Sequence, residues 1–123
     1  MLFAVCLICL IMLSCGKPVL DGALKVQDTT VNVGLVLVGD SVSATFKIRN
    51  NTSYRQAITF LPECDCTTVS TECMTLAPNE RGKLEAKVSV DSPGEFNKNI
   101  YVQLDGSEDF IPFTISGNAK LKE

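Results

Sequence analysis

The feature that most constrains the fold is an alternation of apolar and polar residues along most of the chain. Residues 42–48 show it most clearly, because Ala44, Phe46 and Ile48 alternate with polar residues. A period of two is typical of half-buried strands, and no segment shows sustained helical periodicity. The same pattern recurs at residues 24–26, 31–33, 84–90, 100–104 and 111–115, and the apolar segments 35–38 and 57–61 are further candidate strands. With turn residues between them, about seven short strands predict an all-β immunoglobulin-like sandwich of antiparallel strands.

The apolar faces of these strands are large enough for an independent core. Burial of one large apolar side chain contributes about 1.5–3 kcal/mol. The chain has no tryptophan and no widely spaced cysteine pair, so it is not an antibody-type domain. Pro112 inside the last strand predicts an edge position or a bulge, and Gly117 is expected to end that strand. The predicted core residues are Phe46, Ile48, Ile58, Phe60, Leu76, Leu84, Val88, Ile100, Val102, Phe113 and Ile115.

The N-terminal segment predicts a lipid anchor. Residues 2–13 are apolar without a polar face and lead into Ser14, Cys15 and Gly16, which resemble the cleavage box of bacterial lipoproteins. A buried helix would keep one polar face, and a spanning helix needs about 20 apolar residues. We therefore expect a signal peptide at 1–14, lipid on Cys15, a tether over 15–23 and the sandwich over 24–123. No acidic residue directly follows Cys15, which favours the periplasmic face of the outer membrane.

Charge and composition exclude several function classes. The net charge is −3, with 11 Lys and Arg against 14 Asp and Glu. Without a basic patch we expect no binding to nucleic acid, and membrane attachment through acyl chains alone. The chain has no histidine, so triads that depend on histidine cannot form. The scattered carboxylates are typical of solvated surface, so we expect neither an enzyme nor a cofactor.

Five short motifs occur in order along residues 28–119. They are Phe-Lys-Ile-Arg-Asn at 46–50, Cys-Asp-Cys-Thr at 64–67, Pro-Asn-Glu at 78–80 with Gly82, Gly-Glu-Phe-Asn-Lys-Asn-Ile-Tyr-Val at 94–102 and Ile-Ser-Gly-Asn-Ala at 115–119. Together they resemble the bacterial domain-of-unknown-function family 1573. Asp65 stands where that family has glycine, and Cys73 is an addition to its pattern. The resemblance implies an immunoglobulin-like sandwich in an envelope protein of Gram-negative bacteria, often lipidated, with no settled activity.

Cys64, Cys66 and Cys73 are the thiols that remain after the leader and Cys15. In an oxidising envelope, cysteines are usually paired. If residues 69–72 form a hairpin turn, Cys73 lies near the other two, which predicts a structural Cys66–Cys73 or Cys64–Cys73 disulfide.

Two other interpretations of these cysteines stay open. The three thiols and Met74 could bind Cu(I), or Zn with a nearby carboxylate, although Cys-x-Cys is a weak metal signal. The same cysteines could instead carry out thiol–disulfide exchange, although no flanking basic residue is present to lower a thiol pKa.

The sequence therefore predicts a lipid-anchored envelope protein with a non-catalytic binding or scaffolding domain. We expect a protein partner, because a sandwich offers edge strands and end loops for recognition. The alternative is a periplasmic thiol-redox or copper- or zinc-handling protein that uses the Cys64, Cys66 and Cys73 cluster.

Overall fold

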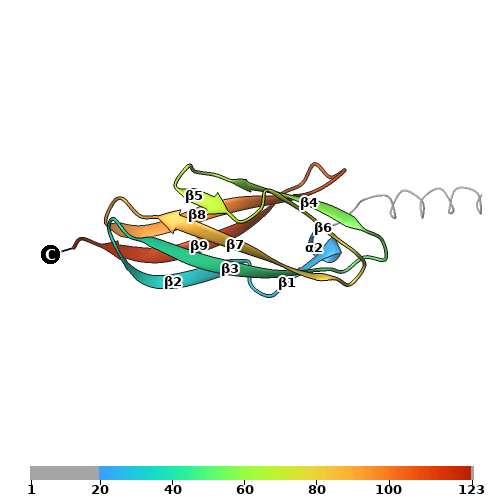
Figure 1. The fold of residues 1–123 in the computed structure, drawn as a ribbon, viewed down its shortest axis with the longest axis horizontal. Coiled ribbons are helices and arrows are strands. Elements are labelled where there is room, and N and C mark those ends of the chain that lie inside the picture. The colour runs from blue at the N-terminus through green and yellow to red at the C-terminus, as the bar shows by residue number, and fades with distance from the viewer. Residues whose placement is uncertain (1–19, 123) are drawn as a thin grey trace, which may run out of the picture.

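The computed structural model describes residues 20–122, which form an elongated sandwich of two β-sheets (Figure 1). The predicted signal peptide and Cys15 lie outside the described residues. Within residues 20–122, no helix is long and apolar enough to cross a bilayer. The elements are α2 Leu20–Ala23, β1 Leu24–Val26, β2 Thr30–Leu37, β3 Ser41–Asn50, β4 Gln56–Pro62, β5 Thr67–Val69, β6 Cys73–Leu76, β7 Arg81–Ser89, β8 Gly94–Leu104 and β9 Ile111–Lys120.

The strands divide into a four-stranded sheet, in the order β1-β3-β7-β5, and a five-stranded sheet, in the order β2-β9-β8-β4-β6. The predicted sandwich is confirmed. Its neighbouring strands are antiparallel except β2 and β9, which run parallel with Thr30 opposite Thr114. This differs from the predicted all-antiparallel arrangement because the N-terminal stretch changes sheets. Its first part, β1, pairs with β3, and β2 then crosses to β9.

The core lies between the sheets, on the faces that the alternation predicts. Every predicted core side chain is buried, with an exposed fraction of 3 % or less. Phe46 on β3 stacks on Phe113 on β9, with ring centroids 4.9 Å apart. This aromatic pair joins the two sheets across the middle of the sandwich.

The last strand departs from prediction at two positions. It continues past Gly117 to Lys120. Gly117 meets a packing requirement and does not end the strand, because a Cβ there would lie 2.6 Å from the Phe96 ring and 2.9 Å from the Gly34 carbonyl of β2. Pro112 is not on an edge strand, since β9 lies between β2 and β8. The Thr114 N–H points toward β2 and donates to the carbonyl of Thr29, the residue before that strand, at 2.7 Å. The Pro112 nitrogen, two residues earlier, points to the same side of β9, but β2 pairs with β9 only from Thr114 onward. A missing donor therefore costs no ladder hydrogen bond there.

Asn50, the last residue of β3, is fully buried and connects three segments. Its Nδ2 lies 2.8 Å from the Tyr54 carbonyl, 3.0 Å from that of Leu76 and 3.2 Å from that of Ala77. Its Oδ1 accepts from the Thr52 amide at 3.0 Å and the Thr52 hydroxyl at 2.6 Å. A buried amide with both ends satisfied stabilises a fold and specifies one arrangement of its neighbours.

The backbone of Asn50 extends the same network to the turn before β7. Its N–H donates to the Glu80 carbonyl at 3.0 Å, and its carbonyl accepts from Asn79 at 2.8 Å. Asn79 adopts a φ of 62°, which asparagine tolerates better than most residues. Asn50 thus fixes the end of β3 against the β6–β7 turn.

Asn50→Ala should lower the free energy of unfolding by roughly 3 kcal/mol, because it removes the donor to the buried Leu76 carbonyl and the acceptor for the Thr52 amide. Urea denaturation measures this loss. The matched control is Asn51→Ala, since Asn51 is exposed and its amide makes a single 3.2 Å bond to Gly22. A change below about 1 kcal/mol is expected there. Equal losses in the two variants would contradict the role given to Asn50.

Candidate functional site

The Cys64–Cys66 disulfide closes the turn by which the chain leaves β4 and enters β5. The two Cα atoms are 5.2 Å apart. Hydrogen bonds hold the turn to both sheets. The Glu63 N–H donates to Asn99 of β8 at 3.0 Å, and the Ser89 N–H of β7 donates to Cys66 at 2.8 Å. The disulfide therefore lies where the chain passes from the five-stranded to the four-stranded sheet.

The predicted pairing of Cys73 with Cys64 or Cys66 is wrong, because Cys73 is an exposed free thiol on β6. That prediction assumed a hairpin turn at residues 69–72. Instead, β5 pairs with β7 and β6 pairs with β4, so the segment crosses between the sheets. The turn at residues 64–67 brings Cys64 and Cys66 together.

The structure does not assemble the four sulfur atoms into one ligand set. Cys64 and Cys66 are bonded to each other. Cys73 and Met74 are neighbours on a strand and point to opposite faces, so Cys73 is exposed while Met74 packs against the core. Among the described residues, no group of three His, Cys, Asp or Glu side chains could hold a metal ion.

Alkylation of the unreduced protein should modify Cys73 and leave Cys64 and Cys66 unmodified, because only Cys73 has a free and exposed thiol among these three. Peptide mass spectrometry before and after reduction measures this difference. A disulfide-linked peptide that contains Cys73 would contradict the structure.

A small polar cluster lies on the outer face of the five-stranded sheet, next to the cysteine turn. The Glu63 carboxylate accepts from the Tyr101 hydroxyl at 2.7 Å and from the Asn99 amide at 3.3 Å. The Tyr101 hydrogen bond, with Asn99 and Lys98, lowers the pKa of Glu63, and the same bond raises the pKa of Tyr101. The raised pKa keeps the Tyr101 hydroxyl protonated, and the cluster lies on an exposed sheet face, so it orders the surface and does not present an activated nucleophile.

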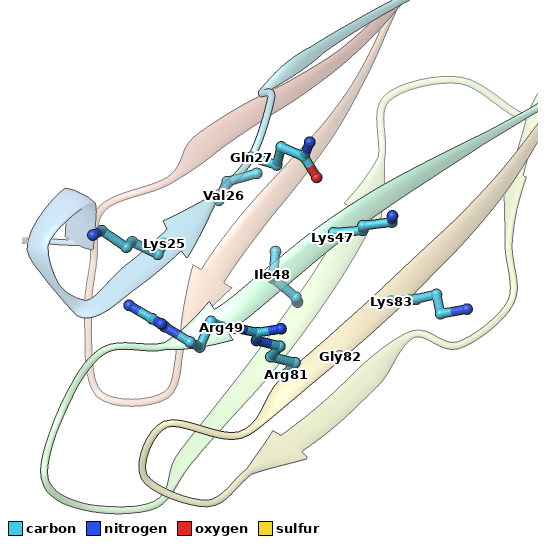
Figure 2. A pocket seen from close by; sticks show the side chains of 9 residues that line it. All are labelled: Lys25, Val26, Gln27, Lys47, Ile48, Arg49, Arg81, Gly82 and Lys83. Atoms are coloured by element: carbon cyan, nitrogen blue, oxygen red, sulfur yellow. The ribbon is translucent and has the colours of Figure 1, made fainter.

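A basic surface groove of about 670 Å³ lies over β1, β3 and β7 of the four-stranded sheet. Figure 2 shows five cationic side chains around it, contributed by all three strands. We call these residues the basic face: Lys25, Lys47, Arg49, Arg81 and Lys83. No carboxylate that the structure describes forms an ion pair with any of them. This corrects the sequence-based expectation that the chain has no basic patch.

The sequence contains a signal for the basic face, but it is divided among distant segments. Each cation occupies a polar, outward position of an alternating strand. The strand pairing places Lys25 opposite Arg49 and Arg49 opposite Arg81, with Lys47 opposite Lys83 in the next row. Only the register of β1, β3 and β7 brings them together.

Exposed leucines gather at one end of the five-stranded sheet. Leu35 and Leu37 on β2 are 67 % and 40 % exposed, and Leu121 after β9 is 60 % exposed. In the register of β2 and β9, Leu37 lies opposite Lys120, the residue before Leu121. We call Leu35, Leu37 and Leu121 the leucine patch. With Lys120 and Lys122 it lines a shallow groove of about 520 Å³.

Comparison with protein families gives one match, over residues 24–119, to a family described as "Protein of unknown function (DUF1573)". The chain belongs to this family. The family membership agrees with the resemblance carried by the sequence motifs. No curated protein matches the chain.

Solved structures show the same fold at low sequence identity. The ASH/PapD-like domain 7 of human CEP192 matches with a TM-score of 0.70 and 10 % identity, over 87 % of this chain and 94 % of that one. A protein of unknown function from Porphyromonas gingivalis W83 gives 0.72 and 12 %, over 82 % and 49 %. WR4, a C. elegans MSP family member, gives 0.58 and 14 %, over 80 % and 99 %. This family member thus has a PapD-like, immunoglobulin-like sandwich.

Proposed function

We propose that this protein is a lipid-anchored envelope protein whose sandwich is a non-catalytic module that binds another protein. The leucine patch is the observation that carries the proposal. Exposed leucines scattered singly need no explanation, but a group on one sheet face marks a surface that a partner covers. Burial of each such side chain would contribute about 1.5–3 kcal/mol to binding before the costs of association.

The geometry of β2 favours side-chain contact over strand addition. The pairing of β2 with β9 shifts between Asn32 and Leu35, and Gly34 in the bulge has a φ of 76°. The Asn32 side chain accepts a hydrogen bond from the Gly34 N–H at 2.8 Å, which satisfies one exposed donor. A bulge of this kind blunts an edge against pairing with another strand. A partner would therefore bind the leucine side chains on the outer sheet face.

Support for a non-catalytic module comes from the chemistry of the described surface. The basic face has no nucleophile, the two cysteines of the turn are bonded to each other, and the Tyr101 hydroxyl beside Glu63 is exposed with a raised pKa, so none of them presents an activated nucleophile. Support for the anchor comes from the sequence around Cys15.

A photo-cross-linking residue at Leu35 should capture a defined protein in native membranes, because a partner covers the leucine patch. Leu121→Asp in the same chain should abolish that capture, since Leu121 lies outside every strand and its change spares the fold. The control site is Ser43, exposed on the other sheet. Equal capture from Leu35 and Ser43, or capture that survives Leu121→Asp, would contradict the proposal.

Cys15→Ser should abolish incorporation of labelled fatty acid and leave an uncleaved precursor, because the cysteine carries both the lipid and the cleavage site. Metabolic labelling and N-terminal sequencing measure both effects. A mature N-terminus at any residue other than Cys15 would overturn the anchor.

A further inference from the structure

The basic face is unusual because its cations face one another across paired strands. Lys25, Arg49 and Arg81 form one row across β1, β3 and β7, and Lys47 and Lys83 form the next. Paired strands lie about 4.7–4.9 Å apart, so like charges stand side by side along both rows. Like charges directly opposite each other destabilise a sheet. This protein nevertheless gathers five of its 11 cations here, while its net charge is −3.

No anionic side chain in the described part of the chain relieves this repulsion by an ion pair. The one described salt bridge joins Lys122 to Asp40, away from the basic face. In strand register, Glu85 stands one row beyond Lys83, opposite Thr45, and it too is without an ion pair. Arg49 is half-buried, and its Nε is shielded from solvent without a hydrogen-bond partner. Among the described residues, the cations of the basic face therefore have no ion-paired counter-charge.

The shape of the basic face favours an extended anionic surface over a single small anion. Its cations are spread over the outer face of three strands, and Figure 2 shows the side chains fanning out instead of converging on one point. No aromatic side chain lines the groove, so it offers no platform for stacking nucleic-acid bases. A layer of lipid phosphates supplies many anions in one plane, which matches charges arranged in rows on a sheet.

We propose that the basic face docks the sandwich flat against an anionic phospholipid membrane. The proposal rests on the lipid anchor proposed above, which limits the distance between the domain and the membrane. Lys25 follows Cys15 by ten residues, a stretch that spans at most about 33–36 Å when fully extended. The first strand of the domain, and the basic face with it, thus stays within reach of the membrane. An acyl anchor and a basic surface reinforce each other in membrane attachment.

Docking in this orientation leaves the leucine patch free. Leu35 and Leu37 lie on the outer face of the five-stranded sheet, because Val36 between them is buried in the core. The two outer faces of a sandwich point in opposite directions. A domain held to lipid by its four-stranded sheet would therefore present the leucine patch to a partner on the side away from the membrane.

The test uses the full-length lipidated protein in vesicles of phosphatidylcholine, with or without roughly a third phosphatidylglycerol. Flotation first reports whether the protein is anchored. A water-soluble amine reagent and mass spectrometry then measure modification of each lysine. On anionic vesicles, modification of Lys25, Lys47 and Lys83 should fall about threefold or more, and high salt should restore it. Lys120, on the other sheet, should react equally on both kinds of vesicle.

Matched charge reversals keep the test specific to the basic face. Lys47→Glu with Lys83→Glu should remove the protection of Lys25, whereas Arg55→Glu with Lys120→Glu, two exposed positions outside the basic face with the same change of charge, should preserve it. Thermal denaturation verifies that both variants fold. Equal modification of the three lysines on the two kinds of vesicle would overturn the docking proposal while the anchor stands. Failure to float with either kind would overturn the anchor and the docking built on it.

Discussion

The buried amide of Asn50 constrains the geometry of one end of the sandwich. The two ends of this amide satisfy the backbone of the loop after β3, the end of β6 and the turn before β7. These segments join the two sheets, so one side chain sets how the sheets meet at this end of the sandwich. Apolar burial supplies most of the folding free energy but is non-directional. A buried amide whose hydrogen bonds are all made also specifies how the chain segments are arranged, because each partner must lie at a particular position.

Asn50 also bears on the basic face, because Arg49 precedes it and points to the opposite side of β3. The network holds the end of β3 against the start of β7, which keeps Arg49 opposite Arg81 despite their like charge. The same register places Lys47 opposite Lys83. The inward side of this strand end therefore stabilises the fold, and its outward side carries the cations of the proposed membrane-docking face.

Much of the fold could be predicted from the sequence, because period-two alternation directly reports which side chains face inward. Every predicted core residue is buried. Alternation carries no information on pairing partners, so the parallel β2–β9 pair and the passage of β5 and β6 into different sheets were missed. The wrong prediction of a disulfide to Cys73 follows from the second of these errors, because it assumed that β5 and β6 form a hairpin. The basic face was missed for the same reason, since a net charge of −3 hides cations that meet only through strand register.

We infer that strand register gathers cations from distant segments into a surface that holds this domain to anionic lipid. The contact with lipid is measured by comparing a nitroxide at Gln27, which lines the basic groove, with one at Thr75 on β6. Both sites are labelled as cysteine variants in a Cys73→Ser background, with the lipidated protein on anionic vesicles. The account predicts that the label at Gln27 is shielded from a water-soluble nickel complex and that the label at Thr75 is not. Equal access at both sites, or stronger shielding at Thr75, would contradict it.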